Sequence, residues 1–94
     1  MSRYALGLDY GTLSVRALVV DCETGREAAE ATYVYPHEVI TGNLPGSTRR
    51  LPPEFALQCP ADYINGALTV IREVLTEING DEIIGVGIDF TACT

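Results

Sequence analysis

The eight residues 9–16 read DYGTLSVR and connect two short apolar runs through a tight turn. The first run, residues 4–9, ends on the carboxylate of Asp9, and Gly11 and Thr12 follow almost at once. This pattern predicts a buried strand, a turn and a second strand over residues 14–21. The turn is suited to phosphate, because glycine lets the backbone approach closely and the Thr12 and Ser14 hydroxyls add donors.

Several residues of this stretch are candidate ligands for the phosphates of a nucleotide. Arg16 would add a planar cation that matches phosphate oxygens, and Asp9 would hold Mg²⁺ through water. The alternative is an ordinary hairpin, with polar ends at Asp9 and Ser14 and with Arg16 on the surface, and the eight residues alone leave both readings open. The chain has no lysine, which excludes a lysine-containing P-loop. The candidate phosphate ligands are Gly11, Thr12, Leu13, Ser14 and Arg16.

The rest of the chain predicts two further strands and one helix. A turn at residues 22–25 precedes an alternating stretch at 26–35, so the first three strands should form an antiparallel meander. Residues 36–59 show no sustained period and predict an irregular excursion. A helix of about five turns is then predicted from Pro60 to a stop at Asn79-Gly80. Its apolar positions recur at helical spacing: Ile64, Ala67, Leu68, Ile71, Leu75 and Ile78.

The last apolar run, residues 83–89, ends on a second carboxylate, Asp89. Such a run is typical of a central strand covered on both faces. The predicted order is therefore β-β-β-α-β, an α/β fold. Tyr33 and Tyr35 are expected to pack in the sheet rather than to stack on a ligand.

Composition restricts the classes of partner. The 94 residues allow one core at most, and 47% of them are hydrophobic, which is enough to bury a core. A net charge of -7 without any lysine repels nucleic acid and anionic membranes. No apolar run approaches the ~20 residues that span a bilayer, and the chain starts into a strand rather than a signal peptide. We expect a cytoplasmic protein without nucleic-acid or membrane partners.

The cysteines and the single histidine predict neither disulfides nor a metal site. The three cysteines are scattered and form no C-x-x-C pair, which favours reduced thiols. His37 has no second ligand at a usable spacing along the sequence, so a zinc site is not expected. The cysteines are Cys22, Cys59 and Cys93.

The motifs together resemble the FGGY carbohydrate kinase family. A strand ending in D-x-G-T-x-S-x-R, a meander, a helix and a glycine-bearing strand ending in Asp are similar to the first phosphate-binding region of these kinases. The segments GVGIDFTACT at 85–94 and ALQCPADY at 56–63 resemble the ribulokinase group in particular, since glycerol and xylulose kinases read closer to G-I-S-x-Q after this last strand. Cys59 departs from the polar residue that many relatives have before the helix proline, and a weaker helix cap is expected.

The resemblance covers essentially all 94 residues and implies a ribonuclease-H-like fold of the actin, hexokinase and Hsp70 ATPase type. Residues 1–94 would be the amino-terminal part of the first domain. The implied reaction transfers the γ-phosphoryl group of ATP, with Mg²⁺, to L-ribulose or a similar pentulose, giving L-ribulose 5-phosphate in arabinose breakdown. The full-length kinase would be a homodimer.

The resemblance also assigns site residues. The catalytic aspartate and the adenosine-binding segments of the family lie downstream, so no catalytic residue is expected here. The chain alone should be inactive and marginally stable, with an unprotected sheet edge. Alternatively, Asp89 caps a turn that Thr91 and Thr94 close. The residues expected to line the sugar pocket are Asp89, Thr91, Ala92 and Thr94.

Two other functions are compatible with the same motifs. One is another pentulose or polyol kinase of the family. The other is a non-catalytic actin-like or Hsp70-like ATPase module, which would share the phosphate loop but not the FTACT ending at residues 90–94. A small stand-alone binding module is the least compatible with the way the sequence ends.

Overall fold

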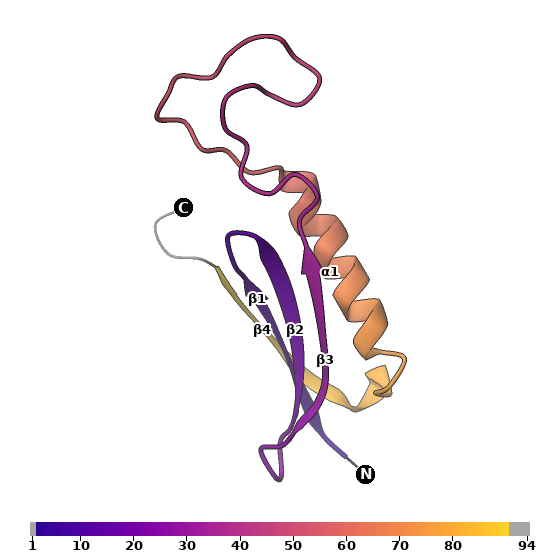
Figure 1. Cartoon of the computed structure of the whole chain (residues 1–94). Helices are drawn as coiled ribbons and strands as arrows, with labels where there is room; N and C mark the ends of the chain where they lie inside the picture. Colours follow the sequence, from indigo (N-terminus) through magenta and orange to yellow (C-terminus); the bar gives the residue numbers. More distant parts are fainter. Residues whose placement is uncertain (1, 91–94) are drawn as a thin grey trace.

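The computed structural model describes residues 2–90 and has the predicted order of elements (Figure 1). Three strands come first, then a helix, a single 3₁₀ turn and a fourth strand. The α/β class and the β-β-β-α-β order are confirmed. The elements are β1 (Tyr4–Tyr10), β2 (Ser14–Asp21), β3 (Glu27–Val34), α1 (Pro60–Val74), η1 (Gly80–Glu82) and β4 (Ile83–Phe90).

The four strands form one mixed sheet in the order β3-β2-β1-β4. β1 pairs antiparallel with β2, and β2 pairs antiparallel with β3, as the meander prediction requires. The turn between β2 and β3 contains Gly25 at φ 73°, a left-handed conformation that glycine adopts without strain. β4 returns after the helix and lies parallel to β1. The crossover through α1 therefore places the carboxyl ends of β1 and β4 at the same edge.

The core lies between α1 and one face of the sheet. Alternate residues of the strands point toward the helix, and α1 contacts β2 and β3. Close approach is possible because the facing residues are small: a Cβ on Gly66 would lie 2.6 Å from Val15 Cγ1. Tyr35 is also fully buried, which confirms its predicted packing role. The buried hydrophobic residues are Leu6, Leu8, Tyr10, Val15, Ala17, Val19, Ala29, Ala31, Tyr35, Val70, Val74 and Ile78.

The helix differs from its prediction in length and in its buried face. α1 ends at Val74 rather than near residue 78, because the chain tightens there: Thr76 N–H donates to Glu73 O at 3.2 Å. The face against the sheet contains Gly66, Val70 and Val74. Three of the predicted core positions are exposed instead, by 65%, 48% and 42%: Ile64, Leu68 and Leu75. The helix packs on the sheet through the face that contains Gly66, because this face allows the closest approach. The bulkier side chains lie to the side of the contact and stay exposed.

β4 also differs from its prediction. It is an edge strand of the described sheet, and its apolar side chains are exposed rather than covered on both faces. Ile84, Val86, Ile88 and Phe90 are each 57–63% exposed. The reason is geometric: α1 lies over β2 and β3 and leaves most of β4 uncovered within residues 2–90 (Figure 1). An unprotected sheet edge was predicted, and the structure has one.

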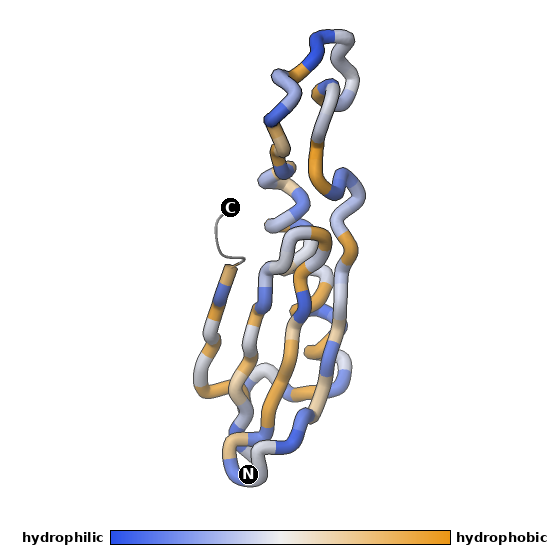
Figure 2. Tube along the Cα trace, turned by 60° about the vertical axis from the view of Figure 1, so that its left-hand side comes forward, coloured by the Kyte–Doolittle hydropathy of each residue, from blue (hydrophilic) through white to orange (hydrophobic). Residues whose placement is uncertain are grey.

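Residues 36–59 form the predicted irregular excursion, which extends beyond the start of the helix (Figure 2). Within it, isolated bridges join Ile40 to Leu57 and Asn43 to Arg50. The excursion makes the molecule long and narrow, with extents of 55 × 24 × 15 Å. In residues 2–90, none of the helical segments has the length and apolar character needed to cross a membrane.

Candidate functional site at the carboxyl ends of β1 and β4

Two carboxylates meet where β1 and β4 end side by side. The parallel register pairs Asp9 with Asp89 and Tyr10 with Phe90. Tyr10 points into the core, so strand alternation directs Asp9 and Asp89 to the opposite face of the sheet. A hydrogen bond with Asp9 is the main reason that the pKa of Asp89 is raised. The hydrogen bond between the two side chains therefore favours the protonated form of Asp89.

A hollow of about 390 Å³ lies on this face of the sheet. Glycines at positions 7 and 87 leave room for it, since nothing lies within 4 Å of where a Gly87 Cβ would be. Arg16 is the register partner of Asp9 and supplies the positive charge. The hollow is lined by Gly7, Leu8, Asp9, Arg16, Leu18, Gly87, Ile88 and Asp89. The hollow thus combines two carboxyl groups, one guanidinium and two glycines that leave its base open.

Arg16 is not held firmly by its neighbour. Its Nε lies 3.8 Å from Glu30 Oε2, and both side chains are nearly half exposed. A surface ion pair of this kind contributes about 0–1 kcal/mol. Arg16 can therefore exchange Glu30 for a phosphate oxygen at little cost.

The hairpin of residues 11–14 directly follows Asp9 and Tyr10. Gly11 N–H donates to Ser14 O at 2.8 Å, and a Cβ on Gly11 would lie only 3.2 Å from that oxygen, so the turn is tight. The Gly11 amide is thus used within the turn. By contrast, in the part of the chain that the structure describes, the amides of Thr12 and Leu13 donate to no protein acceptor. These two exposed donors are available to an anion.

The carbonyls of the hairpin are all engaged by the protein. Tyr35 donates its hydroxyl to Gly11 O at 3.1 Å and its N–H to Leu13 O at 2.9 Å. Gln58 Nε2 donates to Thr12 O at 2.7 Å. With its carbonyls anchored from behind, the hairpin presents N–H groups rather than C=O groups outward.

A tyrosine cluster supports these anchors. Tyr63 donates its hydroxyl to Gln58 Oε1, and its ring lies 5.3 Å from the rings of both Tyr10 and Tyr35. Burial, and next the neighbouring Tyr63, raises the pKa of Tyr35 to about 12, so its hydroxyl stays protonated as a donor. The sequence analysis assigned no site role to Gln58 and Tyr63. The signal was present in the segment ALQCPADY, but only the fold shows that this helix start touches the hairpin.

The predicted site residues are therefore distributed as follows. Asp9, Asp89, Arg16 and the hairpin lie together at one edge of the sheet. Thr91, Ala92 and Thr94, predicted to line the sugar pocket, lie outside the described residues. The ligands of all these residues stay predictions.

No family model matches the chain. Curated relatives do match it. It is 49% identical over 96 residues to a ribulokinase of Shouchella clausii, covering 100% of this chain and 17% of that protein. It is 50% identical over 94 residues to a ribulokinase of Geobacillus thermodenitrificans, covering 98% of this chain and 16% of that protein. It is 46% identical over 95 residues to a ribulokinase of Mycolicibacterium smegmatis.

A solved structure shares the fold. The crystal structure of gluconate kinase from Lactobacillus acidophilus superposes with a TM-score of 0.73 at 20% identity, over 97% of this chain and 16% of that one. The chain thus spans about a sixth of the length of the proteins it matches. The predicted resemblance is confirmed: over essentially its whole length this chain is similar in sequence to ribulokinases, and it folds as the β-β-β-α-β portion of a ribonuclease-H-like sugar kinase.

Proposed function

We propose that this chain forms the phosphate-binding edge of an ATP-dependent kinase that converts L-ribulose to L-ribulose 5-phosphate. One observation carries the proposal: the ends of β1 and β4 bring Asp9 and Asp89 together beside a hairpin with two open amides. The relatives that bear the name ribulokinase support the choice of sugar. In this proposal the adenosine site and the catalytic base are not among these 94 residues.

The hairpin and Arg16 receive the terminal phosphates of ATP in this proposal. The Thr12 and Leu13 amides and the Thr12 and Ser14 hydroxyls donate to phosphate oxygens, and Gly11 keeps the turn tight enough for this approach. Arg16 balances the negative charge that phosphoryl transfer redistributes. Preorganised donors of this kind act by positioning and by charge stabilisation, which dominate phosphoryl transfer.

The carboxylate pair serves the metal and the sugar. Asp9 would hold hydrated Mg²⁺, which would supply positive charge to offset that of the phosphates. Asp89, together with Thr91, Ala92 and Thr94, faces the pentulose. A cytoplasmic location and a homodimer of the full-length enzyme belong to the same proposal.

The test is Asp9→Asn in the full-length gene product. The substitution keeps the size and hydrogen-bonding capacity of the side chain but removes the charge that orders the metal. Turnover should fall ~10²- to 10³-fold with an unchanged melting temperature. Asp21→Asn is the matched control, because Asp21 also ends a strand but lies at the β2–β3 turn, where it accepts from Glu23 N–H at 2.8 Å. Normal turnover and an unchanged Mg²⁺ requirement in Asp9→Asn would refute the metal role.

Two further variants distinguish the two substrates of the site, ATP and the sugar. Thr12→Ala and Arg16→Ala should lower kcat/KM for ATP and leave the affinity for ribulose nearly unchanged, because their donors face phosphate. Substrate kinetics at saturating concentrations of the other substrate measure this. A loss of ribulose affinity with normal ATP kinetics would show that the hairpin serves the sugar.

A further inference from the structure

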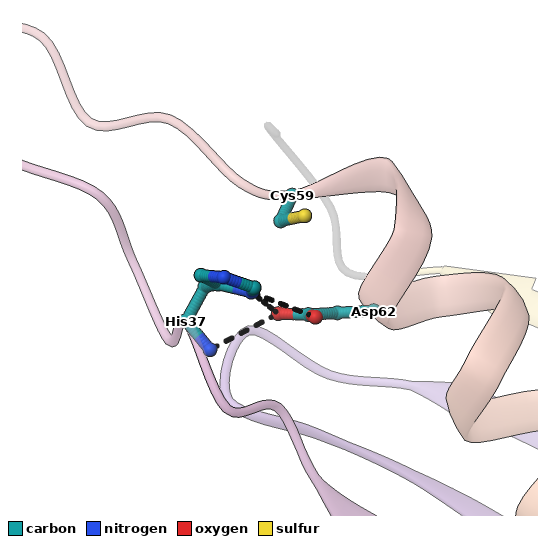
Figure 3. A group of neighbouring side chains, drawn as sticks. All are labelled: His37, Cys59 and Asp62. Carbon is teal, nitrogen blue, oxygen red and sulfur yellow. Dashed lines mark hydrogen bonds and ion pairs between the residues drawn. The ribbon is translucent and has the colours of Figure 1, made fainter. Parts of the chain in front are cut away.

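Three side chains with metal-binding atoms converge at the start of α1, away from the carboxylate pair. They are His37, Cys59 and Asp62, and one ligand atom from each lies within 4.8 Å of the others (Figure 3). This corrects the expectation that His37 has no second ligand. The spacing along the sequence is irregular because the partners come from the two ends of the excursion, which the fold brings together.

The geometry of the cluster is set by Asp62, which is only 3% exposed. His37 Nδ1 lies 2.9 Å from Asp62 Oδ1, and His37 N–H donates to Asp62 Oδ2 at 3.2 Å. His37 lies within a turn that is closed by a hydrogen bond from Glu38 N–H to Tyr35 O at 3.2 Å. Glu38 has φ 50°, which is uncommon for a residue with a side chain. His37 is thereby directed at the helix start.

Cys59 occupies the N-cap position of α1, where serine, threonine, aspartate or asparagine is usual. It makes no side-chain cap hydrogen bond, as the weaker cap predicted from the sequence requires. Its thiol is partly buried, and Sγ lies within 4.8 Å of the ligand atoms of His37 and Asp62 (Figure 3). The helix thus begins with a sulfur that does not cap it and that lies next to an imidazole and a buried carboxylate.

We propose that His37 Nδ1, Cys59 Sγ and Asp62 Oδ1 bind a divalent cation of the zinc class, with a fourth position open to water. Nitrogen, sulfur and carboxylate oxygen are the donor set that zinc prefers. Tetrahedral zinc places such ligands about 3.3–3.6 Å apart. The cation therefore replaces the 2.9 Å hydrogen bond between His37 Nδ1 and Asp62 Oδ1, and a rotation of the Cys59 side chain brings the third ligand in. Asp62 Oδ2 still accepts the hydrogen bond from the backbone N–H of His37, and this contact orients the ligating oxygen Oδ1.

The cation acts as a clamp on the excursion. It joins residue 37, where the excursion begins, to residues 59 and 62, where the excursion ends. Binding requires the Cys59 thiolate and a His37 imidazole with its proton on Nε2, so the thiol proton is released to solvent. None of the three ligands belongs to the hairpin of residues 11–14 or to the hollow beside it, and the clamp does not depend on the proposed kinase activity.

The experiment is titration of the purified chain with Co²⁺, whose thiolate charge-transfer absorption reports a bound cysteine. A Cys22→Ser/Cys93→Ser background leaves Cys59 as the sole thiol. We expect saturation of this absorption at one Co²⁺ per chain, displacement by Zn²⁺, and a higher melting temperature with Zn²⁺. Further substitution of Cys59→Ser should abolish the absorption and the Zn²⁺-dependent shift.

His37→Asn separates a metal site from a simple cap of Asp62. The asparagine can still hydrogen-bond to Asp62, and His37 is exposed, so the fold should persist. Affinity for Co²⁺ should fall at least about tenfold. Unchanged Co²⁺ affinity in this variant, or no saturable absorption in a background chain that circular dichroism shows to be folded, would overturn the proposal and leave the cluster as a hydrogen-bonded helix start.

Discussion

The part of the sheet that α1 covers and the edge strand β4 are built from similar residues but are buried very differently. On β2 and on the helix, Val15, Val19 and Val70 are 0% exposed. On β4, Val86 and Ile88 are 59% and 57% exposed, although they are as apolar and as β-branched. We call these the covered half and the bare half. The difference shows that composition predicts which residues gain from burial, whereas the placement of α1 decides which of them are buried in this chain.

The covered half should therefore provide nearly all of the stability of the isolated chain. Burial of an apolar side chain contributes roughly 1.5–3 kcal/mol only when the side chain actually leaves water. The bare half contributes backbone pairing to β1 and the geometry of the carboxylate pair. Matched substitutions in the two halves test this division.

The largest expected difference is between Val70→Asp and Val86→Asp. The first places an unpaired carboxylate in the core and should lower the free energy of unfolding by about 3–5 kcal/mol, enough to unfold a marginal domain. The second adds a charge at an exposed position and should change it by less than about 0.5 kcal/mol. Urea denaturation followed by circular dichroism measures both. Equal losses in the two variants would mean that β4 is covered in solution.

A smaller difference is expected between two glycine substitutions. A Cβ on Gly66 would meet Val15 Cγ1 at 2.6 Å and Tyr33 Cδ1 at 2.9 Å, whereas nothing lies within 4 Å at Gly85. Packing strain in Gly66→Ala should lower the free energy of unfolding by about 1–3 kcal/mol. The higher helix propensity of alanine offsets about 1 kcal/mol of this loss. Gly85→Ala should be close to neutral. The midpoints of urea unfolding, compared between variants with the same dependence of free energy on urea concentration, measure both effects. A Gly66→Ala variant more stable than wild type would show that the helix can move away from the sheet.

Tyr35→Phe tests how the covered half supports the hairpin. Loss of the hydroxyl removes its hydrogen bond to Gly11 O and should cost about 0.5–1.5 kcal/mol. Amide exchange at Thr12 and Leu13 should also become faster, because the hairpin is less firmly anchored. Tyr33→Phe is the control, since within the described residues the Tyr33 hydroxyl makes no hydrogen bond. Exchange that accelerates equally in both variants would exclude a specific anchor.

The smallest expected effect is the pH dependence of the bare half. The pKa of Asp89 is raised in the folded chain by its hydrogen bond with Asp9. The folded state therefore holds this proton more tightly than the unfolded state, and the associated stability is full below the ordinary carboxyl pKa and lost as pH rises through the raised value. The difference in the free energy of unfolding between the wild type and Asp89→Asn should show this slight decline as pH rises in the acid range. Near neutrality the difference should not change with pH. A carboxyl ¹³C titration that gives Asp89 an ordinary or lowered pKa would contradict the hydrogen bond with Asp9.

Much of the fold was predictable because it depends on short-range patterns. Alternation along residues 14–21, the turn at Gly25 and the position of Pro60 each act within a few residues, and the strands and the helix start lie where these patterns predict. The end of the helix was predicted too late, because the chain tightens at Glu73–Thr76 and Ile78 is buried from a position beyond the helix.

The site was predictable in its residues but not in its supports. Asp9, Gly11 and Arg16 stand out in a short motif, and Asp89 ends an apolar run. Gln58 and Tyr63 do not stand out in the sequence. Gln58 contacts the hairpin across 46 residues of sequence, and Tyr63 contacts Gln58. The spacing rule applied to His37 missed its neighbours Cys59 and Asp62 for the same reason.

By itself, then, the sequence determined the class of fold, the order of its elements and the candidate residues of the phosphate site. These follow from local backbone preferences and from the chemistry of side chains. Only the tertiary structure decided that α1 buries its Gly66 face, that β4 stays bare, and that Asp9 meets Asp89 while His37 meets Cys59 and Asp62. Those outcomes depend on strand register and on which surfaces fit closely, and both are set by contacts between residues far apart in the chain.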